Sequence, residues 1–75
     1  MKVEVTNVFK YEGFWSPEMF ELFPVPYEVG KVFELDVMDP KVGFNLLGEP
    51  CSIRQCMRHP EFGLVLFYQI SVKVV

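Results

Sequence analysis

A cysteine–histidine cluster near the middle of the chain has residue types that could bind a metal. Cys51, Cys56 and His59 give the pattern C-x4-C-x2-H. A structural zinc ion takes four tetrahedral ligands, and its cysteines usually lie close together on a tight turn. Residues five apart in a strand point to opposite faces, and the chain has a single histidine. We therefore expect no zinc site and no disulfide, but one packed thiol, one surface thiol and a solvated imidazole.

The same residues could form a thiol nucleophile and its base. Cysteine–histidine catalysis requires a thiolate beside an imidazole that a third group orients. Cys56 and His59 are near in sequence, but no orienting partner is apparent and a chain of 75 residues leaves little room for a substrate cleft. No phosphate-binding glycine loop or hydrolase motif occurs. We expect no enzymatic activity, no cofactor and no metal.

An aromatic and acidic segment, Glu12–Pro26, is the strongest functional feature of the sequence. Ser16, Pro17 and Glu18 favour the start of a helix, because they supply a capping hydroxyl, a proline at the first helical position and an acid near the positive end of the helix dipole. Pro24 limits this helix to about two turns. The segment is therefore expected as a short helix inserted between the first two strands.

The apolar side chains of this insertion have two compatible roles. Met19, Leu22 and Phe23 share one helix face and would close an open end of a small barrel. The other aromatic residues, with the neighbouring acids, would contact a partner protein, since interface hot spots favour Trp, Tyr, Phe and Met. The predicted partner-binding residues are Phe14, Trp15, Glu18, Phe20, Glu21 and Phe67.

Alternation of apolar and polar residues predicts β-strands in the rest of the chain. The first strand should have its odd positions inward and an irregularity near Asn7. A turn at Asp39–Lys41 should join the second and third strands as a hairpin, and His59–Gly63 should form one tight helical turn. Cys51 and Ile53 should face inward, and Ser52, Arg54 and Cys56 outward. The predicted strands are Lys2–Tyr11, Lys31–Met38, Val42–Leu46, Cys51–Met57 and Leu64–Val75.

The last predicted strand is apolar on both faces in its first half. Leu64, Leu66 and every second residue after them should face the core, whereas Val65 and Phe67 lie on the opposite face. If the edge of this strand were unpaired, a target or a second copy of the chain would add to it, giving a homodimer in the second case. Full pairing with the first strand is the alternative.

Composition and charge narrow the classes of partner. The chain is 51% hydrophobic and 16% aromatic, which is more than a domain of 75 residues hides in its core. The net charge is −3, and residues 1–39 hold eight acids against three lysines. This balance disfavours nucleic acid, which binds clustered cations, and favours a basic protein surface. We expect a cytoplasmic protein, because no basic leader precedes an apolar run and two cysteines suggest reduced thiols.

Several short segments occur in a familiar order: Met1–Val3, Gly30–Leu35, Gly43–Leu46, Gly48–Glu49 and Pro60–Phe62. In this order the chain resembles small SH3-like β-barrel proteins of phages and bacteria, although the Glu12–Pro26 insertion and the strand after Phe62 depart from that pattern. The resemblance implies a mainly β, five-stranded SH3-like barrel and an accessory binding protein. We expect a single domain, residues 1–75, that acts as a non-enzymatic protein-binding module and is a phage-encoded inhibitor of a host protein. A nucleic-acid-binding barrel and a self-assembling subunit are the alternatives.

Overall fold

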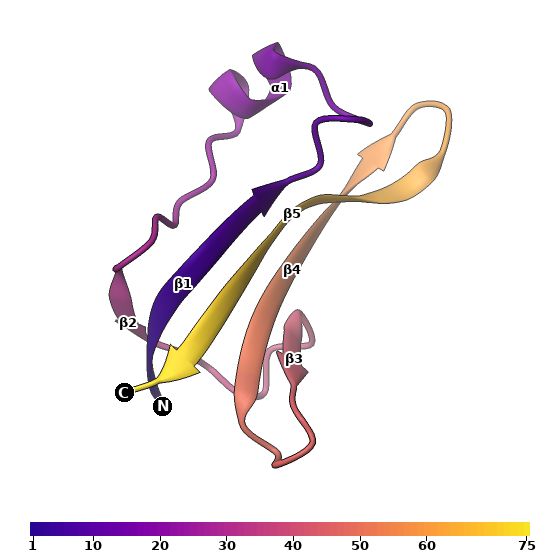
Figure 1. The fold of residues 1–75 in the computed structure, drawn as a ribbon. Coiled ribbons are helices and arrows are strands. Elements are labelled where there is room, and N and C mark those ends of the chain that lie inside the picture. Colours follow the sequence, from indigo (N-terminus) through magenta and orange to yellow (C-terminus); the bar gives the residue numbers. More distant parts are fainter.

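The computed structural model describes all 75 residues and shows one antiparallel sheet with a short helix (Figure 1). The sheet has five strands in the order β2-β1-β5-β4-β3. This confirms a mainly β chain with one helix between its first two strands. The elements are β1 (Lys2–Lys10), α1 (Pro17–Leu22), β2 (Val32–Glu34), β3 (Val42–Phe44), β4 (Pro50–His59) and β5 (Gly63–Val74).

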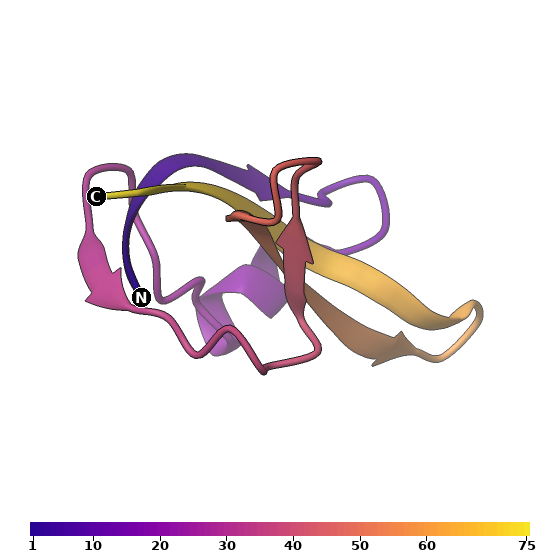
Figure 2. The same ribbon diagram turned by 90° about the horizontal axis from the view of Figure 1, so that it is seen from below.

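The sheet is not closed into a barrel. β2 and β3 lie at its two edges, and the ladders join only β1 to β2, β1 to β5, β4 to β5 and β3 to β4. The predicted hairpin between the second and third strands is therefore wrong. The chain from Leu35 to Lys41 instead crosses from one edge of the sheet to the other, on the concave side of the curled sheet (Figure 2).

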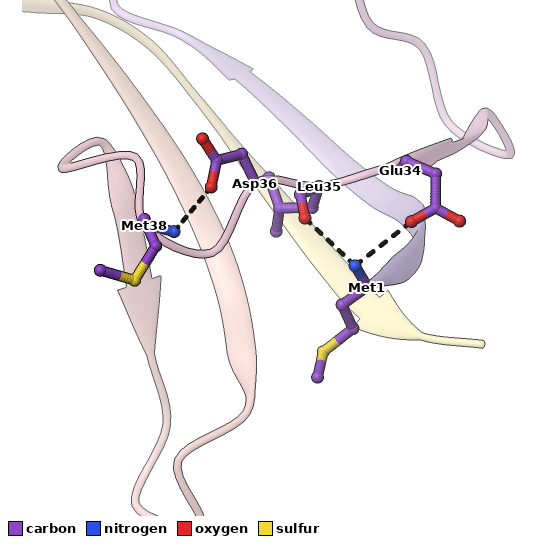
Figure 3. A network of polar contacts seen from close by, with 5 residues as sticks. All are labelled: Met1, Glu34, Leu35, Asp36 and Met38. Atoms are coloured by element: carbon purple, nitrogen blue, oxygen red, sulfur yellow. Dashed lines mark hydrogen bonds and ion pairs between the residues drawn. The ribbon is translucent and has the colours of Figure 1, made fainter.

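Polar contacts at the end of β2 hold the start of this crossing (Figure 3). The N-terminal ammonium group of Met1 lies 3.2 Å from Oε2 of Glu34 and donates to the carbonyl oxygen of Leu35, also at 3.2 Å. The N–H of Leu35 donates to the carbonyl of Met1 at 2.8 Å. These bonds attach the end of β2 to the beginning of β1, away from β3.

Two aspartates then stabilise turns within this crossing segment. Oδ1 of Asp36 accepts from the N–H of Met38 at 3.0 Å (Figure 3), and Oδ1 of Asp39 accepts from the N–H of Lys41 at 2.9 Å. Side-chain bonds of this kind satisfy backbone donors locally and compete with strand pairing. Together with the contacts of Met1 they explain why the predicted strand from Lys31 to Met38 shortens to three residues.

A bulge divides β1 where the sequence predicted an irregularity. The pairing of β1 with β5 shifts between Val5 and Asn7, which places one extra residue on β1. Val3 and Val5, before the bulge, are fully buried. Beyond the bulge the inward face changes, so that Val8 packs against the core and Phe9 is exposed.

A second bulge lies on β5. Gln55 of β4 pairs with Tyr68, but the next residue, Cys56, pairs with Leu66, so Phe67 is the extra residue. Phe67 turns into the core and is 1% exposed, whereas Leu64 is exposed. The expectation of one continuous inward face from Leu64 onward is therefore wrong upstream of Tyr68, because the bulge reverses the alternation there.

β5 is an inner strand, paired with β1 on one side and with β4 on the other. The pairing with β1 covers only Tyr68–Val74, so full pairing with the first strand is wrong, and the first half of β5 has β4 as its one strand partner. Addition of a target or of a second copy to its other edge stays a prediction. β4 and β5 form a hairpin, and the predicted helical turn at its tip is wrong: His59 pairs with Gly63 across the turn. The N–H of Glu61 donates to Nδ1 of His59 at 3.0 Å, and Gly63 adopts φ 76°.

β4 shows the predicted alternation except at one position. Ile53 is buried and Arg54 and Cys56 are exposed, as expected. Ser52 was expected to face outward but is buried. It pairs with Gly43 of β3, and its hydroxyl occupies the space that a side chain at Gly43 would need.

The core is small for the number of apolar residues in the chain. Only 11 of the 75 residues are buried, and the radius of gyration is 13.0 Å, against about 11 Å for a compact chain of this length. The tip of the β4–β5 hairpin extends beyond the rest of the sheet (Figure 1). The nine hydrophobic core residues are Val3, Val5, Trp15, Leu35, Ile53, Phe67, Tyr68, Ile70 and Val72.

Candidate functional site

The connection from β1 to α1 borders two hollows of the surface, which we call the groove and the pocket. The groove is open, has a volume of about 840 Å³, and lies between residues Val8–Phe14 and residues Tyr27–Val29. The pocket has a volume of about 450 Å³ and is lined by Lys10, Glu12, Trp15, Pro17, Phe20 and Glu21. Lys10 and Glu12 border both. Together the two hollows form the β1–α1 site, and four of the six predicted partner-binding residues line it.

Trp15 lines the pocket and is a core residue. It is 5% exposed, and its ring lies edge-on to the rings of His59 and Phe67. Its Nε1–H donates to the carbonyl of Leu66 at 2.9 Å, at a point where β5 extends past the end of β1. The outward orientation predicted for Trp15 is therefore wrong, because its indole completes the hydrogen bonding of β5.

The helix covers the core through Phe20, which stacks on Phe67 with ring centroids 4.4 Å apart. Met19 and Phe20 are half-buried against the core, whereas Leu22 and Phe23, which were expected to face it, are exposed. The helix therefore covers part of the core, but the predicted plug of a barrel end is wrong, because the sheet is open and the predicted face is largely exposed. Phe67 lies beneath the helix and presents no surface to a partner in this chain.

The remaining predicted residues lie on the surface. Phe14 is about half exposed and packs edge-on against Phe62 of the β4–β5 turn, with ring centroids 5.8 Å apart. Glu18 and Glu21 are exposed on α1, and Glu21 lines the pocket. The surface part of the predicted set is thus Phe14, Glu18 and Glu21, with Phe20 partly accessible.

The carboxylates of the site have no cationic partner. The two ion pairs of the chain join Met1 to Glu34 and Lys73 to Glu4, so neither involves the site. The one lysine that borders both hollows, Lys10, places its ammonium group 5.8 Å from the centroid of the Phe20 ring. Glu12, Glu21 and Glu28 therefore give the site a net negative charge that a partner could neutralise.

Sequence reasoning missed the far wall of the groove and the edge of β1 that faces it. Tyr27 packs against the rings of Phe33 and Tyr68, with centroids 5.1 and 6.3 Å apart. Pro24 and Pro26 precede it, and proline has no N–H to donate to a sheet. These two prolines are the signal that could have shown that the chain after α1 does not pair with β1 before Gly30.

The cysteine–histidine cluster forms no joint site. Cys51 is half-buried and Cys56 is exposed, and both are free thiols. His59 lies half-buried between Trp15 and Phe62, and its Nδ1 accepts the Glu61 N–H. The structure contains no group of three or more His, Cys, Asp or Glu residues arranged to hold a metal ion.

Comparison with known proteins finds no relative: no protein-family model, curated protein or solved structure matches this chain. The single helix, α1, lacks the length and apolar character needed to cross a membrane. The function of the chain is therefore inferred from the geometry and charge of the β1–α1 site.

Proposed function

We propose that this protein is a non-catalytic binding module that contacts a basic, partly apolar surface of another protein through its β1–α1 site. One observation carries the proposal: carboxylates without ion pairs border two hollows with partly apolar walls. More large hydrophobic residues are exposed than buried, since fifteen lie on the surface and nine form the core. Exposed apolar patches with a polar rim are typical of protein–protein interfaces.

The layout of the site suits such an interface. Phe14 and Phe20 offer aromatic surface on supports that are already packed, so little side-chain entropy is lost on binding. Glu12, Glu21 and Glu28 at the rim would attract a basic partner and speed its association. The finer predictions of an SH3-like relationship and of a phage-encoded inhibitor of a host protein rest on the sequence resemblance. The predicted cytoplasmic location rests on the cysteines and the N-terminal pattern of the sequence.

Affinity capture with matched variants tests the proposal. The immobilised chain is incubated with a bacterial lysate, in parallel with Phe14→Ala, Glu12→Lys and the control Leu46→Ala. Leu46 is fully exposed, and the β3–β4 turn that carries it lies at the opposite end of the molecule from α1 (Figure 1). Circular dichroism first confirms that each variant is folded.

We expect one or a few proteins to be retained by the wild type and by Leu46→Ala, with binding to the other two variants weakened about tenfold or more. Retention should also decrease with added salt, because the carboxylates are exposed. Equal capture by all four chains, or nucleic acid in place of protein in the retained material, would refute the assignment of this site.

A further inference from the structure

The groove contains an unpaired length of β-strand. β2 pairs only with Lys2–Glu4 of β1. Immediately above, Val5 exchanges two backbone hydrogen bonds with the chain before β2, to the carbonyl of Lys31 and from the N–H of Gly30, both at 2.9 Å. From Thr6 to Lys10 no strand lies on this side of β1, and residues Val8–Lys10 line the groove.

The hydrogen-bonding groups on this edge can be assigned from the pairing on the other side. The N–H of Tyr11 donates to the carbonyl of Phe67 in the direction of β5. Because the backbone direction alternates along an antiparallel strand, Phe9 also faces β5, whereas Val8 and Lys10 face the groove. The carbonyl of Lys10 already accepts from the N–H of Glu12 at 3.0 Å. The N–H and C=O of Val8 and the N–H of Lys10 therefore remain for a partner.

The opposite wall keeps this edge accessible. Pro24 and Pro26 prevent regular pairing of the chain after α1, and Tyr27 is held against Phe33 and Tyr68. Nζ of Lys31 donates to the carbonyl of Pro26 at 3.1 Å and lies 5.5 Å from the centroid of the Tyr27 ring. The groove volume of about 840 Å³ is within the usual range of ligand sites.

We propose that an extended segment of the partner protein adds to β1 as a further strand in this groove. The inference rests on the proposed function and specifies its mode. Main-chain bonds to Val8 and Lys10 would supply affinity, and side chains at alternate positions would contact the apolar walls. Glu12 and Glu28 line the groove without ion pairs and outnumber its one cation, Lys10, so we infer that the segment carries lysine or arginine. A second copy of this chain fits less well, because it would bring a net charge of −3 to an acidic groove.

A displayed library of random twelve-residue peptides, selected on the immobilised chain, provides the probe. We expect enriched peptides to alternate apolar and polar residues and to contain a basic residue. The tightest peptide is then synthesised with N-methyl groups on alternate backbone nitrogens, in two versions offset by one residue. Since only every second N–H of an added strand faces β1, one version should bind about tenfold more weakly and the other nearly as well as the parent.

A pair of variants tests the same contact from the protein side. Lys10→Pro removes the N–H that faces the groove and leaves the bonds of Phe9 and Tyr11 to β5, a position where an edge strand tolerates proline. Lys10→Gln removes the charge but keeps the N–H. We expect Lys10→Pro to bind the peptide roughly fivefold more weakly than Lys10→Gln, and the amide of Val8 to exchange more slowly in the complex.

The outcomes separate this mode from the proposed function. Peptides that lose affinity with Glu12→Lys but tolerate both N-methylated versions would overturn strand addition and leave the binding site intact. If a captured partner instead bound Glu12→Lys and Phe14→Ala as tightly as the wild type, the assignment of the site itself would be overturned. Strand addition would also be overturned if the library yields no peptide above background, or if sedimentation shows that a second copy of the chain occupies the edge.

Discussion

Phe67 is the largest fully buried side chain of the protein, so its burial has a large energetic consequence. Its ring is 1% exposed, is stacked on Phe20 at 4.4 Å and lies edge-on to Trp15 at 5.4 Å. Removal of a buried phenylalanine ring costs about 3 to 5 kcal/mol. A chain of this length has a total stability of about 4 to 11 kcal/mol, so Phe67→Ala would remove between about a quarter and all of it. Phe67→Leu is the informative change, with an expected loss of about 1 to 2 kcal/mol.

Thermal and urea unfolding measure this loss. For a domain of this size, it corresponds to a decrease in Tm of about 4 to 16 °C. Phe44→Leu, at a half-exposed position on the edge strand β3, is the matched control and should stay within about 0.5 kcal/mol of the wild type. A cycle with Phe20→Leu should yield a coupling of about 0.5 to 1.5 kcal/mol for the stacked pair. If Phe67→Leu behaved like the control and the coupling were zero, Phe67 would lie outside the core, and the bulge on β5 would be wrong.

Three further measurements address other parts of the fold. Burial, and to a lesser extent the charge of Tyr27, raises the pKa of Tyr68 above its ordinary value of 10.0, so the folded state holds this proton more tightly than the unfolded state. The contribution of this group to the free energy of unfolding should therefore be constant below pH 10.0 and should decrease as the pH rises above it. In Tyr68→Phe this decrease should be absent. Gly63→Ala should cost about 1 to 2 kcal/mol in urea unfolding because φ is 76°, whereas Gly13→Ala, in open space, should cost nothing measurable. Asn45→Ala removes an acceptor of two backbone N–H bonds in the β3–β4 turn and should lower the free energy of unfolding by about 1 to 2 kcal/mol, while Asn45→Asp should retain most of it.

The local alternation of apolar and polar residues was sufficient to predict the buried face of a strand where the opposite face was clearly polar. In β1 the pairs Val3–Glu4 and Val5–Thr6 determine which face is buried, and Asn7 coincides with the bulge. It was insufficient in the first half of β5, where five consecutive apolar residues, Leu64–Tyr68, fit either orientation. Only the position of the bulge, set by pairing with β4, determines that Phe67 faces the core.

The strand order was the feature of the fold that could least be predicted from the sequence. The turn at Asp39–Lys41 was correctly predicted, yet the strands on either side of it do not pair. A turn favours a hairpin only if both flanking segments lack better partners. Here β2 is held by β1 and by the contacts of Met1, and β3 is held by β4. Such choices between distant partners depend on the whole chain and leave no local signal.

Of the predicted partner-binding residues, Phe14 and Glu21 lie on the surface as expected, whereas Trp15 and Phe67 are buried, and the two errors have a common reason. Aromatic residues are favoured both in cores and in interfaces, so residue type alone does not distinguish them. The hydrogen bond from Trp15 to the carbonyl of Leu66 makes the distinction, because it is required where β5 continues past β1. No sequence pattern shows where one strand continues beyond the end of its neighbour.

Trp15 and Phe20 lie over Phe67 and form what we call the plug. The plug and the groove both result from one insertion, which links stability to binding. Phe67 faces inward and draws Phe20 and Trp15 over the end of the sheet. The chain must then return to the edge of β1, and because Pro24 and Pro26 prevent pairing, it closes the gap only at Gly30. The edge of β1 from Thr6 to Lys10 is thus unpaired because it lies between the plug and Gly30, where the returning chain first bonds to β1. Substitutions that loosen the plug should therefore weaken binding in the groove even though they replace no residue that lines it.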